Sequence, residues 1–307
     1  MNDNMHETFA LLKKRVEDSL SVTDLEHIKY ELSLLDKPTI LTGVGGSSVV
    51  SKFAAKVLNK KNEIVTINSE PRDMLYRNND GFSNVIACSY SGNNHGVTLS
   101  FSNHLKKYLF TNNDEKLNDV TCLQYKSTYA KEKSFISLAS TLIPCSILLD
   151  YYLGREDDLL TELITPSDYK FSKKFPVIEI FSGYDTSSAS KYLESTMTEA
   201  GLALAIVHDK YNYCHGRSTL STVSKNKAIF LNGNNELDDL LLEEIKPYYK
   251  DITILSSEFK NPILRDYDLL IKSMYLTKSL AESEERDISN VNYSPVCKKL
   301  YKYKGNM

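Results

Sequence analysis

The sequence lacks tryptophan, has only five cysteines among 307 residues and contains no apolar run long enough to cross a bilayer. Its cysteines are odd in number and scattered, which argues against a disulfide framework and against a metal site built on cysteine pairs. No signal peptide opens the chain, because the first residues are polar and acidic. We therefore expect reduced thiols, no resident metal or cofactor, no membrane partner and a cytoplasmic location.

A strong charge of either sign is also missing. The chain carries 37 basic and 40 acidic residues, for a net charge of −3. Proteins that bind nucleic acid usually show a basic patch or a basic excess, so this balance argues against nucleic acid as a partner. The apolar content of 41% can fill ordinary cores, and the length suits about two domains.

Short β-rich runs alternate with helical stretches along the chain. Such alternation indicates parallel sheets with helices on both faces, an α/β fold of the Rossmann-like three-layer kind. An acidic, polar segment, 154–174, separates two halves of similar pattern and is expected to be a linker. The expected strands are 38–43, 62–68, 84–89, 106–111, 120–125, 175–181, 228–231 and 252–255; the expected helices are 6–35, 131–153, 186–203 and 236–248, and a short run at 267–271 precedes a last helix to about 281.

Two loops in the first half have the composition of a phosphate site. The first, 43–48 (Gly-Val-Gly-Gly-Ser-Ser), lies between a strand and a helix, where backbone N–H groups and the helix dipole favour an anion. The second, 89–94 (Ser-Tyr-Ser-Gly-Asn-Asn), follows an apolar strand and offers hydroxyls, amides and a glycine that allows close approach. Together they indicate a phosphorylated ligand that is rich in hydroxyl groups.

The first loop has an alternative interpretation. Gly43, Gly45 and Ser48 could form a nucleotide-binding turn, with Glu63 near the place of a ribose-binding acid. This interpretation leaves the loop at 89–94 without a role. A plain turn at 89–94 is also possible on composition alone.

These motifs resemble those of the double SIS-domain proteins, the phosphosugar isomerase-type family that includes the isomerase half of glucosamine-6-phosphate synthase and the fructosamine-6-phosphate deglycases. The first loop matches the family's first ligand loop, and the second matches its Ser-x-Ser-Gly-x-Thr phosphate loop, with an asparagine in place of the threonine. The segment 132–137 resembles the family's Glu-x-x-x-x-Ser segment, whose serine faces the sugar. The residues that the resemblance implies for ligand binding are Gly45, Gly46, Ser47, Ser48, Ser89, Ser91, Gly92, Asn94 and Ser137.

The second half resembles the catalytic part of the same family. Glu199 stands where the family has a catalytic glutamate, and His215 follows it by the family's interval of sixteen residues. Two positions depart from the pattern: Thr196 replaces a lysine, and Arg217 replaces the proline after His-Gly. The basic tail resembles the family's C-terminal segment, in which a lysine enters the site; its candidates are Lys298 and Lys299.

The resemblance implies two SIS domains, 1–160 with the N-terminal helices and 161–285, and a tail, 286–307, that closes over the active site. It also implies a homodimer in which the His-Gly segment of one subunit completes the site of its neighbour. A dimer with two-fold symmetry is the commonest assembly of soluble enzymes. The sequence shows no glutamine-hydrolysing domain of the synthase kind, so we expect the sugar-phosphate reaction alone.

The chemistry of the candidates suits an amino-sugar or sugar phosphate. A partly buried carboxylate such as Glu199 can carry a proton between adjacent carbons, because burial lifts its pKa toward neutrality. The imidazole of His215 suits ring opening, and a tail lysine could stabilise an enediol oxygen or form an imine. We expect an enzyme that removes an amine from a 6-phospho-ketosamine or an amino-sugar phosphate. An aldose–ketose phosphosugar isomerase and a sugar-phosphate sensor without turnover remain the alternatives.

Overall fold

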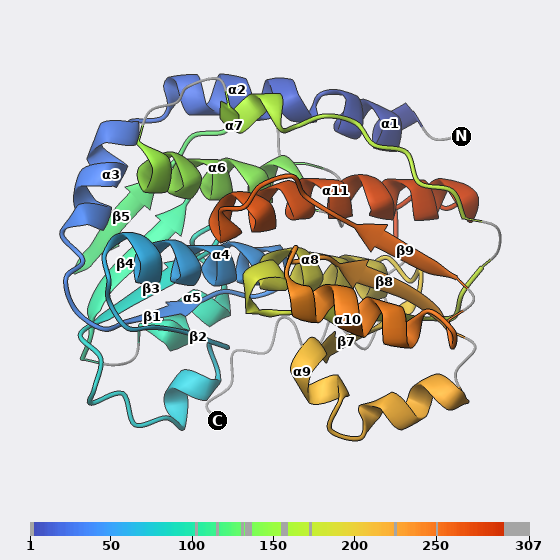
Figure 1. The fold of residues 1–307 in the computed structure, drawn as a ribbon. Coiled ribbons are helices and arrows are strands. Elements are labelled where there is room, and N and C mark those ends of the chain that lie inside the picture. The colour runs from blue at the N-terminus through green and yellow to red at the C-terminus, as the bar shows by residue number, and fades with distance from the viewer. Residues whose placement is uncertain are drawn as a thin grey trace.

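The computed structural model describes residues 3–101, 104–114, 117–129, 132, 137–154, 159–171, 174–223, 226–249 and 251–291. Within these ranges the chain forms two parallel sheets with helices between and around them (Figure 1). The α/β class and the parallel sheets expected from the alternating pattern are confirmed.

The first sheet has five parallel strands in the order β2-β1-β3-β4-β5. Both faces are covered, since α4 packs on one face and α5 on the other, around separate apolar clusters. The elements of this half are α1 (Asp3–Ala10), α2 (Leu12–Val22), α3 (Leu25–Ser33), β1 (Thr39–Thr42), α4 (Gly46–Lys61), β2 (Thr66–Ser69), η1 (Asp73–Leu75), β3 (Asn84–Cys88), α5 (His95–Ser100), β4 (Lys106–Thr111), β5 (Val120–Gln124) and α6 (Ala139–Leu153).

The second sheet repeats this plan with four strands in the order β7-β6-β8-β9. Helix α8 packs on one face, while α9 and α10 contribute to an apolar cluster on the other. The elements are α7 (Leu159–Glu162), β6 (Val177–Ser182), η2 (Tyr184–Thr186), α8 (Ser187–Glu199), β7 (Leu204–Asp209), α9 (Lys210–Tyr213), η3 (Arg217–Thr222), β8 (Lys227–Leu231), α10 (Glu236–Ile245), β9 (Ile252–Leu255) and α11 (Pro262–Ser283).

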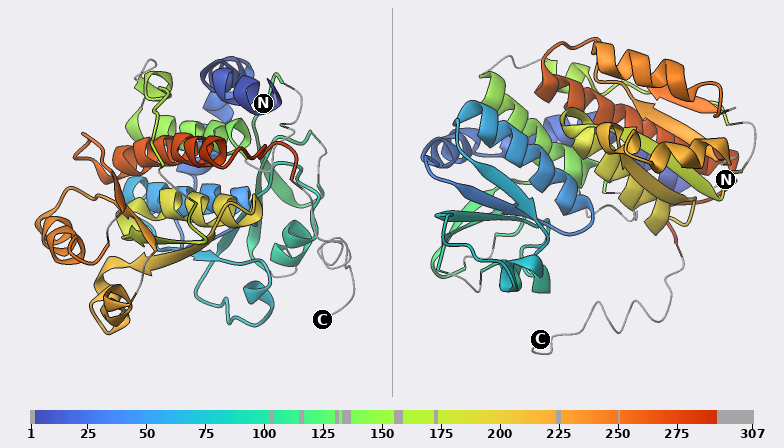
Figure 2. Two further views of the ribbon diagram at one scale, coloured as in Figure 1. Left: turned by 90° about the vertical axis from the view of Figure 1, so that its right-hand side faces the viewer. Right: turned by 60° about the horizontal axis from the view of Figure 1, so that its bottom comes forward.

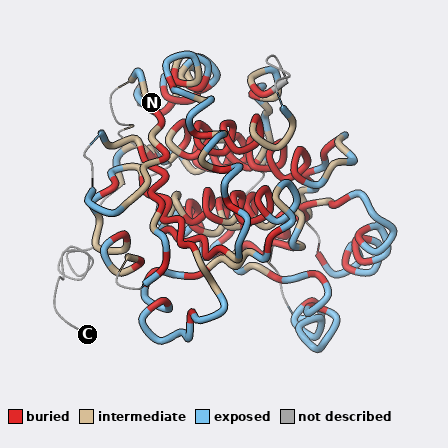
Figure 3. Tube along the Cα trace, turned by 90° about the vertical axis from the view of Figure 1, so that its left-hand side faces the viewer, coloured by how far each residue is buried: buried red, intermediate tan, exposed pale blue. Residues whose placement is uncertain are grey.

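Helices α4, α6, α8 and α11 lie between the two sheets and share one apolar core (Figure 2). The buried parts of the trace are concentrated in these helices and in the strands next to them (Figure 3). Helix α11 is buried around most of its circumference. A helix that is covered on all sides belongs to the interior, so α11 packs in the core that both halves share.

The helical stretch expected at 6–35 is divided into α1, α2 and α3, and the strand expected at 62–68 is the shorter β2 (Thr66–Ser69). Two further elements have different bounds for a local reason. The helix expected at 131–153 begins at Ala139, because the Glu132 carboxylate accepts hydrogen bonds from the N–H groups of Leu138 at 3.0 Å and Ala139 at 2.8 Å. The run 267–271 is interior to α11. That helix begins earlier, where Asn261 accepts a bond from the Ile263 N–H at 2.9 Å and Pro262 opens the first turn.

A buried ion pair connects the two halves. The Lys56 ammonium of α4 bonds to the Asp266 carboxylate of α11, and both side chains are almost completely buried. The same ammonium lies 3.2 Å from Ser187 Oγ at the start of α8. The other Asp266 oxygen accepts the Ala189 N–H of α8 at 3.3 Å. One pair of charges therefore fixes three helices relative to one another.

Removing one partner of this pair should destabilise the whole chain. Lys56→Met leaves the Asp266 charge buried without its counter-ion, which typically costs about 3–5 kcal/mol. Denaturant unfolding would measure the loss, with Lys60→Met as control, because Lys60 is exposed on the same helix. Equal unfolding free energies for the two variants would show that the pair does not hold the helices together.

Candidate functional site

The two glycine-containing loops leave the same edge of the first sheet. Strands β1 and β3 are neighbours and run parallel, so their carboxyl ends lie side by side. The first turn of α5, which directly follows the second loop, lies against the first loop. A Cβ placed on Gly96 would lie 3.3 Å from Val44 Cγ2, 3.1 Å from Asn94 Oδ1 and 3.2 Å from Pro71 Cγ. In open α/β sheets such a point, where neighbouring crossovers diverge, is the usual place for a ligand.

The second loop is held in shape by its own side chains. Ser89 Oγ accepts the Gly92 N–H at 3.2 Å and a bond from Asn94 Nδ2 at 3.0 Å. Asn94 Oδ1 in turn accepts the Val97 N–H at 3.0 Å and so caps α5. Ser89 is buried and Ser91 is exposed. Ser91 is therefore the open hydroxyl of this loop, whereas Ser89 and Asn94 are engaged with each other.

The first loop depends on glycine for its backbone. Gly45 has φ +59° and ψ −131°, a conformation that residues with a side chain rarely adopt. The buried Ser48 hydroxyl donates to the Gly45 carbonyl at 2.6 Å, while Ser47 is partly exposed. A Cβ on Gly46 would lie 2.8 Å from Ser137 Oγ. The structure thus places Ser137, which precedes α6, against the first loop.

Glu199 also reaches the first loop, although it belongs to the second half of the chain. It is the last residue of α8, and its Oε1 would lie 3.7 Å from a Cβ placed on Gly45. The Ser195 hydroxyl, one turn earlier, donates to the same oxygen at 2.6 Å. The loop 43–48, Ser137 and Glu199 therefore converge, and the packing of α4 against α8 is what brings them together.

The surroundings of the Glu199 carboxyl raise its pKa. Burial is the largest cause, and repulsion from Glu194 adds to it, while the bond from Ser195 and attraction to Lys191 act in the opposite direction. One side of Glu199 remains open to solvent in the single chain. The surrounding protein atoms nevertheless desolvate the carboxyl on its buried side, which is the main cause of the raised pKa.

His215 lies elsewhere in the single chain. It follows α9, it is exposed, and among the described residues its ring has no hydrogen-bond partner. Only its backbone N–H is engaged, with the Asn212 carbonyl at 3.1 Å. The structure therefore does not bring His215 to Glu199 within one chain. Lys298 and Lys299 lie outside the described residues.

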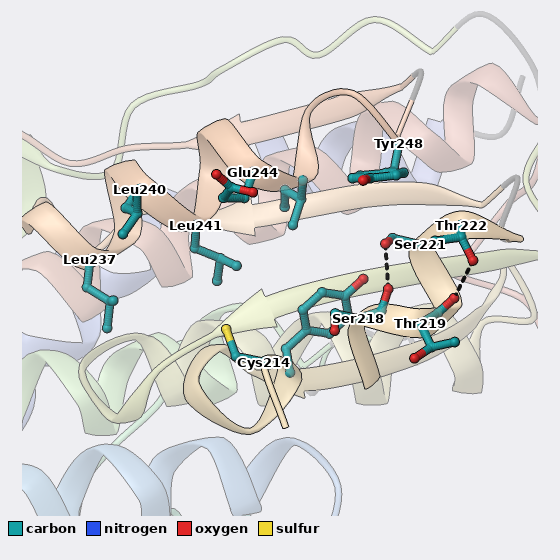
Figure 4. Close-up of a pocket in the computed structure, with 12 residues that line it drawn as sticks. Cys214, Ser218, Thr219, Ser221, Thr222, Leu237, Leu240, Leu241, Glu244 and Tyr248 are labelled. Carbon is teal, nitrogen blue, oxygen red and sulfur yellow. Dashed lines mark hydrogen bonds between the residues drawn. The ribbon is translucent and has the colours of Figure 1, made fainter. Parts of the chain in front are cut away.

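A groove of about 520 Å³ lies beside the His215 segment, away from the two loops (Figure 4). One wall comes from Cys214 and η3, where Ser221 bonds to the Ser218 carbonyl at 2.6 Å and Thr222 to the Thr219 carbonyl at 2.8 Å. The other wall is the apolar side of α10, and several of its side chains are exposed. The residues on that side are Leu237, Leu240, Leu241, Ile245 and Tyr248, together with Glu244.

Neither a metal cluster nor a membrane span is found in the described ranges. No group of three or more His, Cys, Asp or Glu side chains there has the arrangement needed to hold a metal ion. Among the same residues, none of the helices combines the length and the apolar character that crossing a bilayer requires.

No family model and no curated protein sequence matches the chain. Solved structures do. Tagatose-6-phosphate ketose/aldose isomerase from Escherichia coli matches with a TM-score of 0.74 at 14% identity, over 94% of this chain and 96% of that one. The chain has the fold of the phosphosugar isomerases. Glucosamine-6-phosphate deaminase from Thermotoga maritima matches with a TM-score of 0.71 at 14% identity, over 94% and 98% of the two chains. The C-terminal domain of glucosamine-fructose-6-phosphate aminotransferase from Francisella tularensis gives 0.64 at 15%, over 91% and 96%.

Sequence reasoning missed two features of this phosphosugar isomerase fold. Ser195 bonds to Glu199, and the spacing of four residues on one helix could have indicated the pair. The run Gly-Asn-Asn occurs twice, at 92–94 and at 233–235, each time just before a helix. This repeat was visible in the sequence, and it marks equivalent loops in the two sheets.

Replacing Ser195 by alanine should raise the pKa of Glu199 further. The substitution removes a hydrogen bond that stabilises the charged carboxylate and lowers its pKa. The effect of burial, which raises the pKa, is then less well balanced. An NMR titration of the Glu199 carboxyl carbon would measure the change. Ser190→Ala is the matched control, because Ser190 bonds to the Ser187 carbonyl on the same helix. An unchanged or lower pKa in Ser195→Ala would contradict the assignment of this bond.

Proposed function

We propose that this protein is an enzyme that acts on a 6-phospho-ketosamine or an amino-sugar phosphate and releases the amine while it isomerises the sugar. The observation that carries the proposal is the contact of Glu199 with the loop 43–48. A carboxylate with a raised pKa, set against a glycine- and serine-rich loop in a phosphosugar isomerase fold, suits proton transfer on a phosphorylated sugar.

In the proposed reaction the Glu199 carboxylate removes a proton from C-1 of the open-chain ketosamine. The electron pair forms the C-1–C-2 double bond of an enolamine while the C-2 carbonyl oxygen takes up a proton from a second acid. The protonated carboxyl then returns its proton to C-2, and the nitrogen lone pair forms the C-1–N double bond of a protonated imine. Water adds to C-1, the C–N bond breaks, and the protonated amine leaves behind the aldose phosphate. Because burial raises the pKa of Glu199, the carboxyl both accepts and returns the proton more readily near neutral pH.

The phosphate would sit between the loops 43–48 and 89–94. Support comes from their neighbouring positions at the carboxyl edge of β1 and β3 and from the exposed hydroxyl of Ser91. The start of α4 adds the positive end of a helix dipole, without a capping side chain in the way. Phosphate held there would position the reacting carbons, so binding energy far from the reaction would lower the barrier. Ser137 would face the sugar from the opposite side.

We further propose a homodimer in which His215 serves the neighbouring subunit. Its exposed position and the absence of a hydrogen-bond partner for its ring among the described residues support a role in completing another site. His215 would then open the sugar ring as an acid and base. A tail lysine, Lys298 or Lys299, would stabilise the developing oxygen charge.

An aldose–ketose phosphosugar isomerase is the second candidate, because the same proton transfer serves both reactions and a ketose/aldose isomerase has the same fold. Assay of one preparation with a ketose phosphate and with a 6-phospho-ketosamine separates the two. Release of free amine supports the first proposal. Interconversion of the sugars without amine release supports the second, and binding without either product supports a sensor.

Loss of the loop hydroxyls should weaken phosphate-ester binding. In the double variant Ser89→Ala with Ser91→Ala, each lost charge-assisted bond should cost about 1.5–3 kcal/mol of binding free energy. Calorimetry with a sugar phosphate measures the loss. Thr98→Ala, exposed on the neighbouring helix α5, is the control and should bind as the parent does. Undiminished affinity in the double variant would remove the loop from the site.

Complementation tests the shared site. Glu199→Gln and His215→Asn should each be inactive alone, because each lacks one acid–base group. If the two groups meet across a dimer interface, mixing the variants and allowing subunit exchange should restore about one working site in two. The control is a mixture of Glu199→Gln with itself after the same treatment. Failure of every mixed dimer to gain activity would place both residues within one chain.

A further inference from the structure

The second sheet carries a loop equivalent to the phosphate loop of the first. In each, Gly-Asn-Asn follows the third strand of the sheet order and ends in an asparagine that caps a helix. Asn94 accepts the Val97 N–H at 3.0 Å, and Asn235 accepts the Asp238 N–H at 3.0 Å. The loop geometry that suits an anion is therefore present twice in the chain.

The residues at two equivalent positions distinguish the second loop from the first. The third residue after the capping asparagine is Val97 in the first half and Asp238 in the second. The third residue beyond the neighbouring central strand is Gly45 in the first half and Asp185 in the second. Each change introduces a carboxylate at a position that is uncharged in the first domain.

These carboxylates fill the space over the second loop. Asp238 Oδ2 lies 2.5 Å from the Gly233 N–H nitrogen and 2.5 Å from Lys210 Nζ. A Cβ on Gly233 would lie 2.5 Å from Asp185 Oδ2 and 2.8 Å from Asp238 Oδ2. Asp185 is paired with Arg265 Nη1 at 3.1 Å. The Gly233 N–H of this loop is thus already satisfied by the Asp238 carboxylate, and the Asn234 N–H by Asn232 Oδ1 at 2.8 Å.

Lys210 connects this cluster to the His215 segment. It is the first residue of α9, and its buried ammonium also donates to the Leu231 carbonyl at 2.6 Å. Burial lowers the pKa of Lys210, and the bond to Asp238 opposes that shift. The far end of α9 is held as well, since Tyr213 OH lies 3.1 Å from Tyr249 OH. His215 follows two residues later, so the position of α9 determines where the imidazole is presented.

We propose that Asp238 is a built-in anion that occupies the second Gly-Asn-Asn loop and, through Lys210, acts as a positioning residue for His215. Each chain would then have one open phosphate loop, at 89–94, and one closed loop that serves as an anchor. The positioning part rests on the proposed function, whereas the built-in anion does not.

The test removes the Asp238 carboxylate by substitution and supplies a carboxylate in solution as formate. In Asp238→Ala, the melting temperature and kcat should fall, kcat by between about 10- and 100-fold, because the His215 segment loses its anchor. KM should stay within about twofold, since the phosphate loop lies in the other domain. Sodium formate should restore part of both losses, when compared with sodium chloride at equal ionic strength. Asp239→Ala, exposed and adjacent on α10, is the matched control and should respond to neither change.

Three results would overturn the proposal. The first is a wild-type kcat in Asp238→Ala. The second is a loss of kcat with no response to formate, because a purely structural defect would not be repaired by an added carboxylate. If Asp238→Ala does not fold even in formate, Asp238→Asn replaces it, because asparagine keeps the side-chain volume without the charge. The third result that would overturn the proposal is a wild-type kcat in Asp238→Asn. If the wild type turns over no substrate, the proposed function fails, and the formate-dependent melting temperature still decides whether the loop holds an anion.

Discussion

The candidate site depends on the antiparallel packing of α4 against α8. At one end of this contact Lys56 of α4 lies against Ser187 and Asp266, and at the other end Gly45 lies against Glu199. The buried ion pair sets the register of the two helices, because an uncompensated charge in the interior is far costlier than a paired one. Any sliding of α8 would therefore separate the Glu199 carboxylate from the loop 43–48.

The two sheets share a strand order but differ in the charge over their carboxyl edges. In the first, glycine, serine and asparagine leave the loops 43–48 and 89–94 open. In the second, Asp185 and Asp238 are paired with Arg265 and Lys210 over the equivalent edge. Burying Asp238 and Lys210 is tolerated because each has its counter-ion and a further hydrogen bond, and the partly buried Asp185 is paired with Arg265. One architecture thus provides an open loop and a filled one.

Electrostatics at Glu199 follow from its position between the halves. Desolvation by both halves favours the neutral carboxyl, while Ser195 stabilises the charged form. The balance suits a group that must accept and return a proton, since efficient acid–base catalysis needs a pKa nearer to the working pH than that of a solvated glutamate. A solvated glutamate without the packing of the first loop and of its own helix neighbours would lack this property.

Much of the fold follows from local pattern. The alternation of apolar strands and helices predicted parallel sheets, and loops 43–48 and 89–94 were found from residue type, because glycine, hydroxyl and amide side chains act on the backbone next to them. The errors were local as well. The helix expected from 131 begins only at Ala139, because the Glu132 carboxylate accepts the N–H groups at the helix start. The run 267–271 lies inside α11, which is buried on most sides, so its apolar residues do not show a helical period.

The sequence by itself determined the α/β class and both loops. Its comparison with a known family supplied Glu199, His215 and the tail lysines as candidates, of which Lys298 and Lys299 lie outside the described residues. Only the tertiary structure decided that Glu199 meets Gly45 and that His215 is exposed in the single chain. It also decided that the second Gly-Asn-Asn loop is filled by Asp238. The physical reason is that these contacts join residues far apart in the chain, and such contacts are set by the packing of helices and the pairing of buried charges rather than by neighbouring residues.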